Sequence, residues 1–198
     1  RDLKYKHVPL KLEGYKIVIS NTKKKRSLGA VKYNERRKEC EEGYKILKEA
    51  LPNITCLGDI SCAEFEKYKS LIKDDTMRKR VEHVIYENDR VLKSVEALEN
   101  GDILRFGRYM VDSHVSLRDL YEVTGIELDT MVEEALKVDG TIGSRMTGAG
   151  FGGCTVSIVR EDAVEAFIEK VGENYFNKVG IKAEFYISEA ADGGREIK

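Results

Sequence analysis

Short stretches near both ends of the chain alternate apolar with polar residues. Residues 15–20 read Tyr-Lys-Ile-Val-Ile-Ser and are rich in β-branched side chains, a pattern typical of a β-strand. Comparable patterns predict strands over residues 154–159 and 183–188.

The middle of the chain carries apolar residues at helical spacing instead. This spacing predicts amphipathic helices over residues 31–51, 76–98, 103–121, 126–138 and 161–179. Ser61 followed by Glu64 predicts a capping box at the start of a shorter helix that reaches Ile72. On the last helix, the spacing places these side chains inward: Val164, Phe167, Ile168, Val171 and Phe176.

The order of these elements indicates the fold class. Strands lie at the two ends, and residues 35–138 between them are mostly helical. This order favours an α+β domain, in which an antiparallel sheet packs on helices and carries a helical insertion. The 198 residues suffice for one such domain, which we assign to residues 1–198.

Glycine is concentrated in residues 140–153, which hold six of the 17 glycines of the chain. Gly148, Gly150 and Gly153 match the spacing G-x-G-x-x-G, but a strand rather than a helix is predicted to follow, which argues against a dinucleotide-binding fold. No Gly-Lys-Ser/Thr follows, so a Walker A loop is excluded. The segment is either a tight structural turn or a loop that approaches a ligand with its backbone, with Arg145 as a nearby cation.

Composition excludes several classes of function. The net charge of −1 favours neither nucleic acid nor an acidic membrane surface, and no apolar run is long enough to span a bilayer. The four cysteines and three histidines lack zinc-ligand spacing. We therefore expect reduced thiols in a cytoplasmic protein.

Four other features favour a structural role over a catalytic one. His114 is expected to be structural and hydrogen-bonded, and Cys154 to be a buried core thiol. The pairs Glu41-Glu42 and Glu133-Glu134 are expected on solvated helix faces. The basic run at residues 23–26 is expected to be a solvated turn, although it could also face phosphates.

Motifs along nearly the whole chain resemble those of one enzyme family. Residues 143–154, Gly-Ser-Arg-Met-Thr-Gly-Ala-Gly-Phe-Gly-Gly-Cys, resemble the third motif of the GHMP small-molecule kinases, and more narrowly that of the galactokinases. Residues 33–41, Tyr-Asn-Glu-Arg-Arg-Lys-Glu-Cys-Glu, resemble the YNxRRxECE segment of galactokinases. Further similar stretches are residues 7–10, 15–19, 21–22, 25–26, 113–119, 121–129 and 192–194.

The resemblance implies a fold, a reaction and a site. It implies a ferredoxin-like GHMP C-terminal domain, and phosphoryl transfer from ATP, with Mg²⁺, to the C1 hydroxyl of α-D-galactose. It also implies an active site between this domain and an N-terminal domain. Tyr33 would contact the sugar, although a plain role at the start of a helix is equally compatible with its position. The glycine loop would border the cleft through Gly143, Ser144, Arg145, Gly148, Ala149, Gly150, Gly152 and Gly153.

Other parts of the family pattern are missing. The first motif, the serine-rich phosphate loop and the catalytic Asp do not occur in this sequence, and Val31 stands where the family often has Ser. The abrupt start at Arg1 suggests a fragment, and we expect the chain alone to be inactive. Two alternatives remain open: a galactokinase-like sugar sensor without turnover, and an N-acetylgalactosamine kinase.

Overall fold

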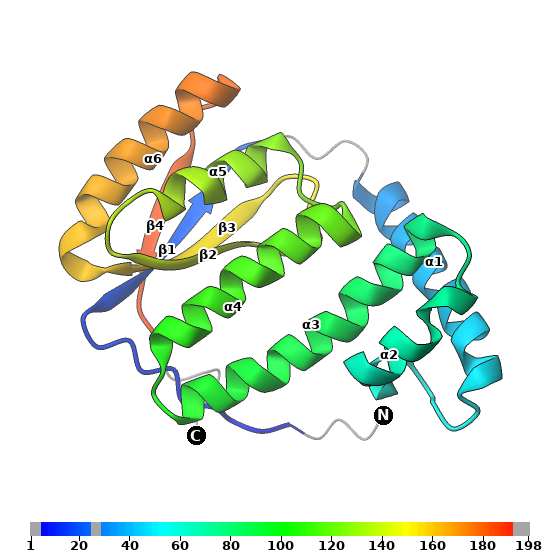
Figure 1. The fold of residues 1–198 in the computed structure, drawn as a ribbon. Coiled ribbons are helices and arrows are strands. Elements are labelled where there is room, and N and C mark those ends of the chain that lie inside the picture. Colours follow the sequence, from blue (N-terminus) through cyan, green and yellow to red (C-terminus); the bar gives the residue numbers. More distant parts are fainter. Residues whose placement is uncertain (1–4, 25–28, 192–198) are drawn as a thin grey trace, which may run out of the picture.

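A four-stranded antiparallel sheet forms one side of the molecule (Figure 1). The computed structural model describes residues 5–24 and 29–191. The strands are β1 (Tyr15–Asn21), β2 (Thr141–Thr147), β3 (Cys154–Arg160) and β4 (Glu184–Ser188), in the order β2-β3-β1-β4. The three strands predicted from the sequence are confirmed to within a residue or so at either end. The fourth, β2, lies inside the glycine-rich segment, where the sequence predicted only a loop.

The helices occupy the predicted positions. They are α1 (Gly29–Ala50), α2 (Cys62–Tyr68), α3 (Asp75–Glu99), α4 (Ile103–Ser116), α5 (Ile126–Leu136) and α6 (Val164–Val179), and a π-helical turn, Leu117–Tyr121, extends α4. The capping box at α2 is confirmed, because the Glu64 N–H donates to Ser61 Oγ and the Glu64 carboxylate accepts from the Ser61 N–H.

Helices α5 and α6 cover one face of the sheet (Figure 1). The core between them contains Val18 and Val159 from the strands and Met131 and Phe167 from the helices, all fully buried. The succession β1-α5-β2-β3-α6-β4, with the sheet order given above, is the ferredoxin-like arrangement, and it confirms the predicted fold class.

One inward residue of α6 was predicted wrongly. Phe176 is 51% exposed, whereas Tyr175 is fully buried. Neighbouring helical positions differ by about 100° around the axis. Placing the buried face of the helix one position too late therefore exchanges the two residues. The Tyr175 hydroxyl donates to the Thr22 carbonyl at 2.9 Å, which satisfies its polar end inside the core.

Helix α4 lies along the outer edge of β2 and shields this edge strand (Figure 1). The Met146 N–H donates to His114 Nδ1 at 3.2 Å, and His114 is buried. The predicted structural, hydrogen-bonded role of His114 is therefore confirmed.

Helices α1, α2 and α3 pack against one another beside the sheet and enclose a second hydrophobic core. Its buried centre includes Leu47, Phe65, Ile72, Val81 and Ile85. The sequence assigned residues 35–138 to a helical insertion, but of these helices α4 packs along β2 and α5 packs on the sheet, so only α1, α2 and α3 form a separate block.

Two expectations about single residues were wrong. Glu134 is buried rather than solvated: its carboxylate accepts from Lys137, Lys178 and Asn174. Burial tends to raise the pKa of this carboxyl, but the two lysines outweigh it and hold the pKa below its ordinary value. Cys154 is only partly buried, because it begins β3 next to the loop rather than in the middle of the strand.

Candidate active-site loop

The glycine-rich segment divides into two parts with different structures. Residues 141–147 form β2, and residues 148–153 form the loop that leads into β3. Gly143, Ser144 and Arg145, which the sequence placed in an active-site loop, therefore lie in a strand. The prediction is corrected for these three residues, and Gly148, Ala149, Gly150, Gly152 and Gly153 remain as the loop.

Packing explains the glycine at position 143. A Cβ atom on Gly143 would lie 2.5 Å from the carbonyl oxygen of Gly107 in α4, and a Cβ atom on Gly107 would lie 2.2 Å from that of Ile142. The two glycines thus let α4 and β2 approach backbone to backbone. Ser144 is buried on the other side of the strand, with its Oγ 2.8 Å from Ser157 Oγ.

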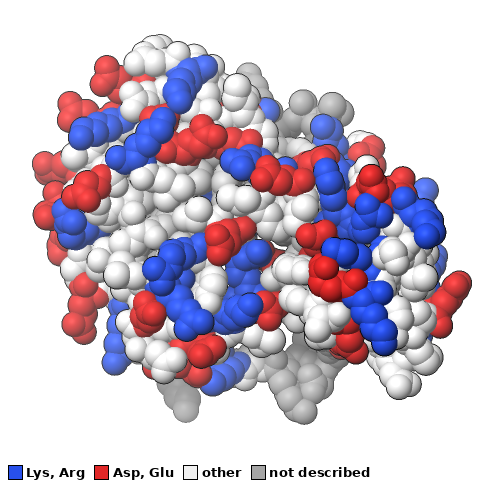
Figure 2. Space-filling model, viewed as in Figure 1, with Lys and Arg blue, Asp and Glu red and all other residues white. Residues whose placement is uncertain are grey.

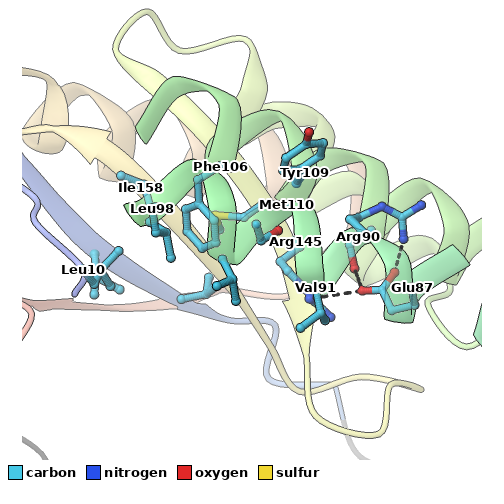
Figure 3. Close-up of a pocket in the computed structure, with 15 residues that line it drawn as sticks. Leu10, Glu87, Arg90, Val91, Leu98, Phe106, Tyr109, Met110, Arg145 and Ile158 are labelled. Atoms are coloured by element: carbon cyan, nitrogen blue, oxygen red, sulfur yellow. Dashed lines mark hydrogen bonds and ion pairs between the residues drawn. The ribbon is translucent and has the colours of Figure 1, made fainter. Parts of the chain in front are cut away.

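Arg145 points into a pocket of about 400 Å³ between the sheet, α3 and α4 (Figure 3). Its guanidinium Nη1 lies 3.6 Å from Glu87 Oε1, and the Glu87 carboxylate also accepts from Arg90 and from the Ser113 hydroxyl. Burial lowers the pKa of Arg145, and Glu87 opposes this effect. Leu98, Phe106 and Ile158, among others, give the rest of this pocket an apolar lining.

Conformation, rather than packing alone, explains the glycines of the loop. The φ angles are +81° at Gly148, +81° at Gly150, +112° at Gly152 and +96° at Gly153, a region that residues with a side chain rarely adopt. Phe151 is also left-handed, at +58°. The tip of the loop around Gly148 is exposed, so its backbone is accessible from outside.

The loop is held by the end of β1 and by the turn that follows the π-helical residues. The Phe151 N–H donates to the Val123 carbonyl at 2.7 Å, and Thr22 donates to the Gly153 carbonyl through its N–H (2.9 Å) and its hydroxyl (2.7 Å). A Cβ atom on Gly150 would lie 2.1 Å from the Val123 carbonyl oxygen. These contacts fix the base of the loop and leave its tip free for another group.

Two lysines lie next to the loop. The side chain of Lys24 packs on Gly152, and its ammonium pairs with Glu127 at 2.7 Å. The ammonium of Lys32, at the start of α1, lies 5.5 Å from the centre of the Phe151 ring. Lys24 belongs to the basic run that the sequence assigned to a solvated turn; residues 25 and 26 of that run, like residues 192–194 of the resemblance, lie outside the described residues.

Tyr33 follows Lys32 and is 54% exposed. It borders a groove of about 440 Å³ that is also lined by Cys40, Tyr44 and Tyr121. The contact between Lys32 and Phe151 brings this end of α1 to the glycine loop. Tyr33 thus directly follows a residue that contacts the loop, and its own side chain is accessible.

Sequence reasoning missed the side chains that support the loop. Val123 and Glu127 lie in the stretch 121–129 that resembles galactokinases, but the resemblance did not show that they and Lys32 contact the loop. The described residues contain no group of three His, Cys, Asp or Glu side chains that could hold a metal ion. None of the helices in the described part of the chain could cross a membrane.

Basic and acidic side chains are interspersed over the face shown in Figure 2. This mixture agrees with the near-neutral net charge of −1.

Comparison with known proteins gives a consistent result. Residues 94–177 match the family described as GHMP kinases C terminal. This part of the chain is thus similar to the C-terminal domain of GHMP kinases. The match covers α4 and both parts of the glycine-rich segment.

Similar proteins extend the match to nearly the whole chain. The galactokinase of Clostridium beijerinckii is 53% identical over 98% of this chain and 50% of its own length. The galactokinase of Lactococcus lactis, solved in complex with galactose, superposes with a TM-score of 0.94 at 45% identity, over 99% of this chain and 50% of that one. Mevalonate kinase of L. major, at 20% identity and a TM-score of 0.53, shares the fold. The chain thus spans about half the length of these galactokinases.

Proposed function

We propose that this chain forms the C-terminal half of a galactokinase, which transfers the γ-phosphoryl group of ATP to the C1 hydroxyl of α-D-galactose. The observation that carries the proposal is the similarity to galactokinases along the entire chain, at 53% identity in one of them and with a TM-score of 0.94 in another. The shared region includes Tyr33 and the whole loop.

The loop has the properties that such a reaction requires of this half. Phosphoryl transfer depends mainly on positioning and on stabilisation of phosphate charge. A loop with consecutive left-handed residues can present backbone N–H groups to an anion, and its exposed tip carries no large side chain. The residues present thus fit the phosphates of ATP, and Lys32 adds a cation beside Phe151 of the same loop.

Other parts of the reaction require residues outside this chain. Mg²⁺ would neutralise phosphate charge when bound, and we assign its ligands mainly to the other half of the enzyme. The same holds for the carboxylate that orients the sugar hydroxyl. The role of this half is to bind and orient, with Tyr33 against the sugar and the loop against the nucleotide.

A hybrid enzyme tests the proposal. This chain would be joined to the half of the Clostridium beijerinckii galactokinase that it does not match, and ADP formation would be measured with galactose, with N-acetylgalactosamine and without sugar. We expect galactose-dependent turnover by the hybrid and none by the chain alone. The control recombines the two halves of the relative itself in the same way.

Three results would contradict the proposal. Binding of galactose and ATP by the hybrid without turnover would favour a sugar sensor, and a preference for N-acetylgalactosamine would favour the other kinase. An inactive hybrid beside an active control would show that this half cannot serve a galactokinase.

A further inference from the structure

Arg80 of α3 is a buried charged residue, with only 2% of its surface exposed. Each of the three nitrogen atoms of its guanidinium donates a hydrogen bond. Its Nε donates to Glu39 Oε2 at 3.2 Å, its Nη2 donates to Glu122 Oε2 at 2.7 Å, and its Nη1 donates to the Leu120 carbonyl. One side chain thus joins α1, α3 and the turn after α4.

The turn needs such donors because a helix ends there. The last carbonyls of a helix have no partner within it, and the π-helical extension of α4 ends at Tyr121. Arg80 supplies a donor to the carbonyl of Leu120, and Arg36 Nε donates to that of Tyr121 at 2.7 Å. The chain then turns sharply at Glu122, whose φ of +53° is unusual for a residue with a side chain.

The charges in this cluster balance. Arg36 and Arg80 face Glu39 and Glu122, and Arg36 Nη1 also donates to Glu39 Oε2 at 3.1 Å. Because a planar guanidinium can bond three acceptors in fixed directions, Lys could not replace Arg80 in this arrangement.

The residue after this turn holds the glycine loop. The Val123 carbonyl accepts from the Phe151 N–H at 2.7 Å, and Gly150 lies against the same carbonyl. Glu122 immediately precedes Val123, whose own N–H donates to the Leu117 carbonyl at 3.2 Å. On the other side of the cluster, Arg36 lies one helical turn after Tyr33.

We infer that Arg80 is a positioning residue, which fixes the glycine loop relative to the helix that carries Tyr33. It touches neither substrate itself. The inference rests on the proposed function for its catalytic meaning, since it supposes that Tyr33 and the loop serve one reaction. Its structural part concerns this chain alone and can be tested without activity.

Amide hydrogen exchange in this chain tests the structural part. Arg80→Lys keeps the positive charge but loses the planar guanidinium that donates in three directions. We expect exchange of the Phe151 amide to accelerate about tenfold or more, because the Val123 carbonyl that accepts from it becomes mobile. Exchange in the centre of β1, at Val18, should change much less. Arg78→Lys is the matched control, since Arg78 lies in the same helix and pairs with Asp75 away from the turn.

Glu122→Gln is a second variant, which weakens the same link without altering α3. It should accelerate exchange of the Phe151 amide in the same way but to a smaller extent. If Arg80→Lys does not fold, this variant tests whether the cluster supports the loop. An unchanged Phe151 amide, or equal acceleration at Val18 and Phe151, would overturn the inference, because Arg80 would then be irrelevant to the loop or important only for general stability.

The hybrid enzyme tests the catalytic part. Arg80→Lys should lower kcat/KM for ATP and for galactose together, since the loop and Tyr33 lose their common support, while Arg78→Lys should leave both unchanged. Unaltered kinetics in Arg80→Lys would overturn the catalytic part. An unsubstituted hybrid without turnover would instead refute the proposed function, so the two failures are distinguishable.

Discussion

The two parts of the glycine-rich segment use the same residue type for different reasons. In β2, Gly143 allows two backbones to touch, and a side chain there would collide with Gly107. In the loop, Gly148 has no neighbour within 4 Å of a Cβ position, but its φ is +81°. Glycine in the strand serves packing, and glycine at the loop tip serves a backbone conformation that leaves the chain open to a ligand.

This comparison teaches that glycine density alone does not define a binding loop. A substitution in the strand should damage stability, whereas one at the tip should damage binding. Gly150 stands between these cases, because it has both a left-handed φ of +81° and a close contact with Val123. The following predictions are arranged from the largest effect to the smallest.

Gly143→Ala should lower the free energy of unfolding by about 3 kcal/mol, since a Cβ atom 2.5 Å from a carbonyl oxygen forces α4 away from β2. Urea unfolding followed by circular dichroism measures this. Gly58→Ala is the control: its nearest neighbour would be at 3.4 Å and its φ is not left-handed, so we expect a change below about 1 kcal/mol. Equal stability of the two variants would show that packing does not require glycine at position 143, and the contrast with the loop glycines would fail.

Gly150→Ala should lower the free energy of unfolding by about 2 kcal/mol, since it combines backbone strain with a collision at the Val123 carbonyl. The loop should also detach from the turn, so exchange of the Phe151 amide should accelerate more than the loss of global stability explains. If the amide stays protected, the loop does not depend on this contact.

Gly148→Ala should cost only about 1 kcal/mol, the strain of a left-handed residue with a side chain in open space. The same urea titration measures it. A loss as large as that of Gly143→Ala would mean that the loop tip is packed rather than accessible, contrary to our description.

Acid should loosen the loop before it affects the strand. The hydrogen bond from Arg80 lowers the pKa of Glu122 below its ordinary value of 4.5. The contribution of this pair is therefore present above pH 4.5 and is lost as the pH falls through the lower value in the folded state. Protection of the Phe151 amide, corrected for the intrinsic exchange rate, should decrease there while that of Val18 persists.

Glu122→Gln is the control for this small effect, because it removes the titrating group. A decrease of the same size in the variant would assign the acid response to other carboxylates and would separate Glu122 from the loop.

Much of the fold could be predicted from the sequence because its strands and helices have strong periodic patterns. Strand β2 was missed because Gly143 and its neighbours resemble a loop, and glycine is unfavourable in strands. Only the contact with Gly107, 36 positions earlier in the chain, explains it. Tertiary packing determined this element, and a local pattern could not show it.

The candidate site could be predicted only in part. The motif identified the loop from Gly148 to Gly153 and pointed to Tyr33, and the structure brings the start of α1 to this loop. The supports of the loop could not be predicted, because Arg80 is distant in sequence from Glu122 and Val123, and the resemblance of residues 121–129 did not show which groups these residues contact after folding. The burial of Glu134 depends in the same way on Lys178 from another helix.

The central claim is that the exposed tip of the loop contacts the nucleotide in a galactokinase. Steady-state kinetics of the hybrid enzyme with Gly148→Ala test it most directly, with thermal unfolding of the same samples as the check on folding. We predict that kcat/KM for ATP falls about tenfold or more while the variant remains folded at the assay temperature. A folded variant with the kcat/KM of the unsubstituted hybrid would contradict the claim.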